Sequence, residues 1–186
     1  MHIKTILSLA VLLAGISGPV IAVQQGDTYL GAGQSKVIID PNASGVEEMG
    51  PTSAVVRFGY SMADSVAVEG RIGSGVGNDT VGDSGDKIDV DIKRIVSGYL
   101  AGYFPVSDRF SLYWLAGISS VSIELNKPGG GYSRSDDIGL SYGIGAEANI
   151  TKSISGYFEY IEYPDGDYKT EDLDIKAATI GAKYSF

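Results

Sequence analysis

Charged side chains that stand alone among glycines and serines are the residues of this chain that could do chemistry. On the polar faces of alternating segments there are seven of them: Arg57, Glu69, Arg71, Lys93, Glu147, Glu159 and Lys183. Two carboxylates on neighbouring segments, Glu147 and Glu159, could form a general acid–base pair. Structural ion-pair networks also bring carboxylates together. We therefore interpret the two glutamates as ion-pair partners of Arg57, Arg71 or Lys183.

Histidine and cysteine, on which many catalytic and metal sites depend, are nearly lacking. The chain has no cysteine and one histidine, His2. A thiol nucleophile and a cysteine-ligated zinc are therefore excluded. A Ser-His-Asp arrangement is also excluded once the N-terminal segment is removed. We expect a protein that is not an enzyme and has no cofactor and no metal site.

The N-terminal segment, residues 1–22, has the pattern of a secretory signal peptide. Lys4 precedes an apolar run over residues 6–16, Gly18 and Pro19 end that run, and a cleavage site is predicted after Ala22. The run is shorter than the ~20 residues that a membrane-spanning helix needs. Cleavage of 22 of the 186 residues leaves one domain, residues 23–186, with 13 basic and 23 acidic residues and a net charge of −10. Such a charge argues against nucleic acid as a partner.

Apolar and polar residues alternate with a period of two throughout the remaining chain, which predicts β-strands. In residues 138–150, for example, Ile138, Leu140, Tyr142 and Ile144 fall on one face, and glycine or serine separates them. Eight such runs are predicted, at residues 28–39, 51–60, 65–74, 87–104, 110–125, 137–150, 154–163 and 173–186.

The connections between these runs alternate in length. Residues 61–64, 105–109 and 151–153 form short turns, whereas residues 40–50, 75–86, 126–136 and 164–172 form longer loops that are rich in Gly, Asp, Asn and Pro. This alternation is typical of an antiparallel up-and-down β-barrel with its short turns at one end.

The polar faces of the strands indicate which side of the barrel is inside. They are mostly glycine and serine with nearly balanced charges, which suits the narrow lumen of an eight-stranded barrel because buried charges must be paired. Counted from Phe104 or from Phe186, the apolar face continues for ten residues before a cation, Arg94 or Lys176. This length matches the ~9–11 residues of a membrane-spanning strand. We therefore predict a transmembrane β-barrel, with Arg94 and Lys176 as outer-interface cations that meet lipid phosphates.

Aromatic residues are expected to form girdles at the edges of the apolar band. Beside the short turns these are Tyr60, Phe104, Phe110, Tyr184 and Phe186, and beside a long loop Tyr163.

The chain ends in Ala178-x-Ile180-x-Ala182-x-Tyr184-x-Phe186, and with this ending it resembles the small eight-stranded outer-membrane barrels of the OmpA/OmpX type. The resemblance covers residues 23–186. It implies the bacterial outer membrane, periplasmic short turns, extracellular long loops, and a C-terminal signal for the barrel-assembly machinery that includes Ile180, Tyr184 and Phe186.

Several functions stay open at this point. The runs at 87–104 and 110–125 exceed the membrane thickness, which favours an envelope-structural or adhesin-like role with a projecting β-ribbon. A small channel and a soluble lipocalin-like binder are the alternatives. We expect a monomer whose partners are membrane lipid, lipopolysaccharide and a surface protein ligand. The acidic residues of the second and fourth long loops are interpreted as solvated charge rather than a calcium site.

A folded membrane barrel keeps its shape in detergent until it is boiled. We expect the chain of residues 23–186, refolded in detergent, to migrate differently on a gel before and after boiling. A soluble protein that detergent unfolds would give one band position under both conditions, and that result would contradict the barrel.

Overall fold

The computed structural model describes residues 25–41, 50–77, 79–81, 88–127, 130–164, 166–168 and 171–186 of the chain. Ten strands occur in these ranges: β1 (Thr28–Pro41), β2 (Thr52–Ala63), β3 (Val66–Gly77), β4 (Asp79–Val81), β5 (Ile88–Ser107), β6 (Phe110–Lys127), β7 (Gly130–Asn149), β8 (Ile154–Glu162), β9 (Gly166–Tyr168) and β10 (Glu171–Ser185). Within the same ranges, no helix is long and apolar enough to cross a membrane.

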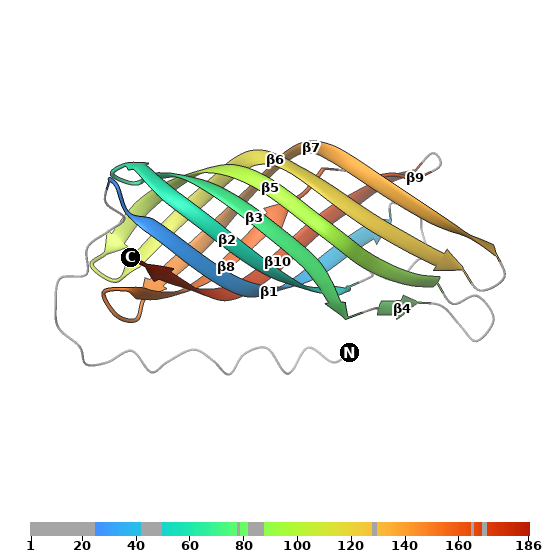
Figure 1. The fold of residues 1–186 in the computed structure, drawn as a ribbon, viewed down its shortest axis with the longest axis horizontal. Coiled ribbons are helices and arrows are strands. Elements are labelled where there is room, and N and C mark those ends of the chain that lie inside the picture. Colours follow the sequence, from blue (N-terminus) through green and yellow to red (C-terminus); the bar gives the residue numbers. More distant parts are fainter. Residues whose placement is uncertain are drawn as a thin grey trace.

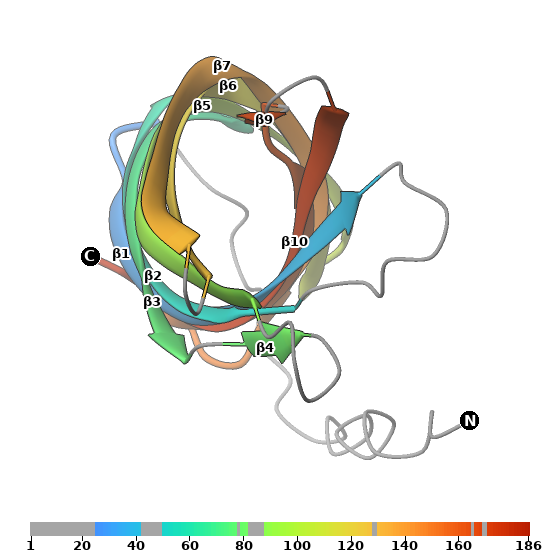
Figure 2. The ribbon, with the colours of Figure 1, turned by 90° about the vertical axis from the view of Figure 1, so that its right-hand side faces the viewer.

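Eight of the strands form a closed antiparallel ring, which confirms the predicted up-and-down barrel (Figures 1 and 2). The order around the ring is β1-β2-β3-β5-β6-β7-β8-β10, and β10 pairs with β1 to close it. The closing ladder runs from Tyr29↔Ser185 to Pro41↔Leu173. At the loop end, the short strand β4 pairs with β5 and the short strand β9 pairs with β10.

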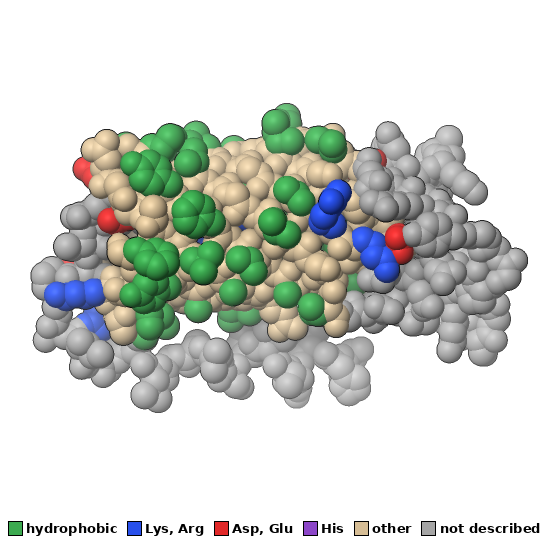
Figure 3. Space-filling model, in the orientation of Figure 1, with side chains coloured by type: hydrophobic (Ala, Val, Ile, Leu, Met, Phe, Trp, Pro, Cys, Tyr) green, Lys and Arg blue, Asp and Glu red, His purple; other side chains and the backbone are tan. Residues whose placement is uncertain are grey.

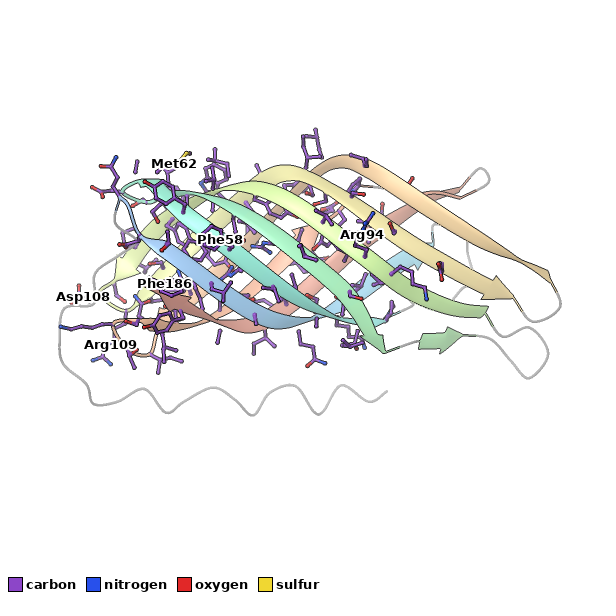
Figure 4. All side chains as sticks on the ribbon, in the orientation of Figure 1. Phe58, Met62, Arg94, Asp108, Arg109 and Phe186 are labelled. Carbon is purple, nitrogen blue, oxygen red and sulfur yellow. The ribbon has the colours of Figure 1, made fainter. Side chains whose placement is uncertain are left out.

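The short turns lie at one end of the barrel, as predicted. They connect β2 to β3 at residues 64–65, β5 to β6 at residues 108–109, and β7 to β8 at residues 150–153. Figure 4 shows Met62, Asp108, Arg109 and Phe186 at this end, while Arg94 lies nearer to the opposite end. In an outer-membrane barrel the short-turn end is periplasmic.

The predicted long loop at residues 126–136 is wrong. The ladder between β6 and β7 continues from Val121↔Asp137 through Leu125↔Ser133 to Lys127↔Gly130, so most of this segment is strand. In the sequence of residues 126–136, glycine and polar residues stand at odd and even positions alike, because strands outside the membrane need no apolar face. The alternation that indicates a strand is therefore absent from the sequence.

The outward face of the barrel is apolar over the predicted band, which excludes the lipocalin-like alternative. Figure 3 shows hydrophobic side chains over the wall and cations at both ends of the barrel. We call this surface, between the short turns and the level of Arg94 and Lys176, the apolar band. Its exposed large side chains include Leu30, Val56, Phe58, Ile72, Leu100, Phe104, Leu112, Ile118, Leu140, Ile144, Phe158 and Ile180.

Lys93 does not face the lumen, so that expectation is wrong. A register shift between Ile92 and Arg94 marks a β-bulge in β5, and both Lys93 and Arg94 are exposed. Lys93 lies 3.0 Å from the carboxylate of Glu124. Because a bulge adds one residue to a strand, it changes which side chains point inward. Between Phe104 and Arg94, alternate residues face outward as predicted. Beyond the bulge the alternation is shifted, so Ile92 is buried and Lys93 is exposed.

Most of the predicted girdle lies where expected, and one member does not. Tyr60, Phe104, Phe110, Tyr184 and Phe186 are exposed beside the short turns. Tyr163 is only 6% exposed and faces the lumen, so its assignment to a girdle is wrong. The side chains of Asp79, Asp83, Asp86, Asp89 and Asp91, and of Asp165, Asp167, Glu171 and Asp172, lie outside the described residues.

Two glycines allow tyrosine rings to lie flat on the inner wall. Gly59 is opposite Tyr29, and Gly145 is opposite Tyr113. A Cβ atom added at either glycine would overlap the ring of the opposing tyrosine. Because glycine has no side chain, each ring can lie over the glycine opposite it. Each hydroxyl then reaches toward the middle of the lumen.

Gly145→Ala is expected to destabilise the barrel by about 1–3 kcal/mol, because the methyl group would displace the Tyr113 ring. Urea unfolding in lipid vesicles, followed by the fluorescence of the single tryptophan, measures this change. Gly70→Ala is the matched control, since nothing lies within 4 Å of a Cβ atom at Gly70. Equal unfolding midpoints for the two variants would contradict the proposed role of Gly145.

Candidate functional site

The most highly charged part of the lumen is a layer of four side chains: Arg57, Glu69, Arg71 and Glu159. We call it the charge layer. Arg57 and Arg71 are directly opposed on β2 and β3, an arrangement that is unfavourable for like charges. All four side chains are at most 3% exposed. Two carboxylates must therefore compensate two adjacent buried guanidinium groups.

Glu159 provides most of this compensation from the far side of the barrel. Its two oxygen atoms accept hydrogen bonds from Nη1 and Nη2 of Arg71, at 2.5 and 3.0 Å. Arg57 Nη1 donates to Glu159 Oε2 at 3.5 Å. Strands β3 and β8 are four positions apart in the ring of eight, so the Arg71–Glu159 pair spans the lumen.

Glu69 completes the layer on the near side. It accepts a hydrogen bond from Nε of Arg71, and its Oε2 atom lies 3.7 Å from Nη1 of Arg57. Each guanidinium group therefore contacts both carboxylates. A bidentate guanidinium–carboxylate pair is stronger and more directional than a contact between point charges.

Tyrosine hydroxyl groups donate further hydrogen bonds to the two carboxylates. Tyr113 donates to Glu159 Oε2 and Tyr29 donates to Glu69 Oε2, each at 2.8 Å. The guanidinium carbon of Arg57 lies 3.6 Å from the ring centre of Tyr157, and that of Arg71 lies 5.0 Å from the ring centre of Tyr99. These cation–π contacts add to the stabilisation of the buried cations.

A second ion pair lies closer to the short turns. Lys183 Nζ is 2.5 Å from Glu147 Oε1, and it also lies 4.7 Å from the ring centre of Tyr29. With this pair, the described part of the lumen holds three buried cations and three buried carboxylates. The charge of the described lumen is thus balanced.

Toward the loop end, small hydroxyl side chains replace the charges. Ser119 is hydrogen-bonded to Ser97, Ser141 and Tyr99 at 2.6–2.9 Å, and Ser35 contacts Thr179 at 2.7 Å. We call these residues the hydroxyl layer. Hydroxyl groups satisfy one another here without any charge.

Beyond the hydroxyl layer the lumen is filled by aliphatic side chains. We call this group the aliphatic layer, and it consists of Val37, Ile92, Ile95, Val121, Ile123, Ile161 and Ile175. All are buried, and they come from β1, β5, β6, β8 and β10. Polar side chains therefore do not line the described lumen along its whole length.

Arg94 and Lys176 lie on the outside of the barrel. Arg94 is exposed on β5 (Figure 4). On β10, Lys176 Nζ lies 3.2 Å from Asp174 Oδ2, and this hydrogen bond raises the pKa of Lys176. Both cations are therefore accessible at the loop-side edge of the apolar band.

The C-terminal side chains line the apolar band at the short-turn end. Ile180, Tyr184 and Phe186 are all exposed, and the rings of Tyr184 and Phe186 meet edge to face with centres 5.1 Å apart. The amide of Phe186 donates to the carbonyl of Thr28 at 3.0 Å. The predicted cleavage position, Ala22, lies outside the described residues.

Comparison with known proteins identifies the family. The sequence pattern of the outer membrane protein beta-barrel domain matches residues 7–186. The chain belongs to this outer-membrane β-barrel family. No curated protein matches the sequence.

Solved structures with the same fold share little sequence with this outer-membrane barrel. Neisserial surface protein A is 14% identical, with a TM-score of 0.64, and the match covers 87% of this chain and all of that one. The attachment invasion locus protein Ail of Yersinia pestis, solved with the heparin analogue sucrose octasulfate, is 18% identical, with a TM-score of 0.62 over 88% of this chain and all of Ail. OprG of Pseudomonas aeruginosa is 14% identical, with a TM-score of 0.62 over 89% of this chain and 98% of OprG.

Sequence reasoning missed the lumenal tyrosines of this outer-membrane barrel. Six buried tyrosines line the described lumen: Tyr29, Tyr99, Tyr103, Tyr113, Tyr157 and Tyr163. Their odd or even positions on the strands could have revealed them. Tyr29 lies on the same face as Gly31, and Tyr113 lies on the same face as Leu115, whereas the residues next to each tyrosine face outward. Aromatic residues are typical of the girdles at the membrane interfaces, so residue type alone does not distinguish a lumenal tyrosine from a girdle tyrosine.

Glu159→Gln is expected to destabilise the outer-membrane barrel by about 3–5 kcal/mol, because it leaves two buried guanidinium groups with one carboxylate. Denaturant unfolding in vesicles provides the measurement. The matched control is Glu124→Gln, which removes a partly exposed ion pair and should cost less than about 1 kcal/mol. Equal losses for the two variants would show that the charge layer does not support the fold.

Proposed function

We propose that this outer-membrane barrel is a non-enzymatic surface-interaction protein, whose rigid barrel presents an extended β-ribbon to a partner outside the cell. The observation that carries the proposal is the length of β7, which continues beyond its ladder with β8. A role in envelope structure is compatible with the same fold, since the ribbon would then contact other envelope components.

Three strands continue past the apolar band at the loop end. β5 and β6 remain paired from Arg94↔Ser122 to Asp89↔Asn126, and β6 and β7 remain paired up to Lys127↔Gly130. β5 and β7 contain 20 residues each and β6 contains 18, well above the ~9–11 residues that span a membrane. We call this extension of β5, β6 and β7 the ribbon.

At the loop end, β7 continues beyond its ladder with β8. β7 pairs with β8 only from Tyr142↔Glu162 to Asn149↔Ser155, whereas it pairs with β6 from Gly130 onward. Continuing the register would place Pro164 opposite Leu140, and proline has no amide hydrogen to donate. We propose that an extended polypeptide adds to the sheet as a further strand beside residues 130–136 of β7, beyond the end of the ladder with β8.

The filling of the lumen supports an interaction role over the alternative of a small channel. An ion or solute would have to pass the charge layer, where Arg71 and Glu159 are joined across the lumen, and then the aliphatic layer. Neither layer offers a hydrated path. A channel would require both layers to rearrange.

The same packing supports a non-enzymatic role. The carboxylate of Glu159 accepts hydrogen bonds from Arg71, Arg57 and Tyr113, and Glu147 is paired with Lys183. Carboxylates held in this way are structural partners rather than a free acid–base pair. No group of three or more His, Cys, Asp or Glu residues suited to a metal occurs in the described ranges.

Charge indicates which class of surface ligand fits. Residues 78–91 contain five aspartates and one lysine, and residues 165–174 contain five acidic residues and one lysine. Ail was solved with a heparin analogue, but an acidic loop end repels a polyanion. We therefore propose a polypeptide ligand, which binds through its backbone, rather than a sulfated polysaccharide.

Other partners stay predictions. We propose that Arg94 and Lys176 meet phosphate groups of lipopolysaccharide, that the C-terminal residues Ile180, Tyr184 and Phe186 are read by the barrel-assembly machinery, and that the protein is a monomer. The exposure of these side chains supports the first two proposals.

Shortening the ribbon tests the proposed function. Deletion of Glu124, Leu125, Ser133 and Arg134 removes two facing residue pairs and preserves the alternation of faces. We expect bacteria that display this variant to adhere about tenfold less to immobilised matrix proteins than bacteria that display the unmodified chain. Adhesion to immobilised heparin should be low for both.

Deletion of residues 43–46 from another connection is the matched control and should leave adhesion unchanged. Full adhesion by the shortened ribbon would contradict the proposal. Stepwise conductance of the unmodified protein in planar bilayers would favour the channel instead.

A further inference from the structure

The outer wall carries a polar side chain inside the apolar band. Gln34 faces outward from β1 and is exposed. It is opposite Ala54 of β2 on one side and Ile180 of β10 on the other. On β10, Ile180 lies four residues from Lys176, which ends the band, and six residues from Phe186. The Gln34 amide therefore lies deep in the band, where hydrocarbon surrounds the wall.

The amide of Gln34 has no hydrogen-bond partner among the described residues. Within the same residues, it is also the only carboxamide on the apolar band. Bilayer hydrocarbon holds no water, and acyl chains have no group that forms hydrogen bonds, so an unpaired amide there is unfavourable. A carboxamide has both donors and an acceptor. Two copies of Gln34 can therefore satisfy each other through two reciprocal hydrogen bonds.

Small side chains around Gln34 allow another wall to come close. Ala32 and Ala54 are exposed beside it, and Ala182 is exposed on β10 opposite Ala32. We call these four residues the Gln34 surface. Lipid is as apolar as the wall, so association in a membrane depends on close packing and hydrogen bonds rather than on the hydrophobic effect. The Gln34 surface offers both.

We propose that the Gln34 surface pairs two copies of the chain in the membrane. Both copies keep the same orientation, so the twofold axis runs along the membrane normal and Gln34 meets its own copy at the same depth. Membrane-spanning strands are tilted by about 35–45°, so the two copies of β1 cross at Gln34, and the copies of Lys36 diverge toward the loop end. Such a contact is small. The monomer therefore remains the stable unit in detergent, and pairs form where the membrane concentrates the chain.

The Gln34 surface lies on the wall opposite the ribbon. In the ring of eight strands, β6, the middle strand of the ribbon, is four positions from β1. Pairing through β1 therefore leaves the ribbons of both copies accessible. A pair would present two ribbons, and two linked contacts hold a ligand-covered surface more firmly than one. This consequence rests on the proposed function, whereas the pairing itself does not.

Cross-linking in vesicles tests the pairing, since the chain has no cysteine of its own. Ala32→Cys places a thiol beside Gln34, and Ala116→Cys, the matched control, places one at an exposed position of β6. Residues 23–186 are refolded into dilauroylphosphatidylcholine vesicles and treated with a flexible bis-maleimide. Ala32→Cys should give about tenfold more covalent dimer than Ala116→Cys, and adding Gln34→Leu should reduce its yield about tenfold. Equal yields from the two cysteine variants, or a yield that Gln34→Leu leaves unchanged, would overturn the proposal.

Energy transfer measures the association without a thiol in the contact surface. Lys152→Cys, at an exposed position of the turn between β7 and β8, carries a donor dye in one half of the protein and an acceptor dye in the other. Transfer in the same vesicles should rise with the ratio of protein to lipid. Gln34→Leu should need about tenfold more protein for the same transfer.

Ser120→Leu is the control for this measurement, because it removes a polar side chain from the outward face of β6 and should leave the transfer unchanged. Heat-dependent gel migration verifies that each variant is folded, and Gln34→Ala replaces Gln34→Leu if the latter does not fold. Equal transfer with and without Gln34 at every ratio of protein to lipid would show that lipid alone surrounds this side chain, and would overturn the pairing.

Discussion

Arg71 and Glu159 are joined across the full width of the barrel, and the rest of the lumen is organised around this pair. Arg71 lies directly opposite Arg57, so neither cation could be buried without a carboxylate that reaches them from elsewhere. Glu159 reaches them from the far wall, Glu69 from the near wall, and two tyrosines complete the carboxylate shells. The aliphatic layer packs the lumen toward the loop end, and in the charge layer a bidentate ion pair holds opposite walls together.

The pleat of the strands gives two surfaces from one alternating pattern, and each surface uses small residues differently. On the inside, Gly59 and Gly145 make room for Tyr29 and Tyr113, which orient the charge layer. On the outside, Ala146 leaves a hollow between Leu112 and Phe158. Small residues therefore allow close packing inside the lumen and leave a hollow on the outer wall.

Period-two alternation was enough to predict the eight strands, their short turns and the faces on which Arg57, Glu69, Arg71, Glu147, Glu159 and Lys183 lie. It was not enough to predict three other features. The bulge at Lys93 shifts the register locally and has no signature in residue type. The ribbon part of β7 is polar on both faces, so it lacks alternation. The partners of each charge depend on which walls face each other across the lumen, and that is a property of the closed ring.

The closing ladder joins β1, the first described strand, to β10, the last one. Because Phe186 donates to Thr28, the first residue of β1 and the residue that follows β10 are hydrogen-bonded neighbours. Contacts between such distant parts of a chain form slowly, and the ring cannot close before β10 has reached the membrane. Until then both β1 and β10 present open edges that need protection from other chains.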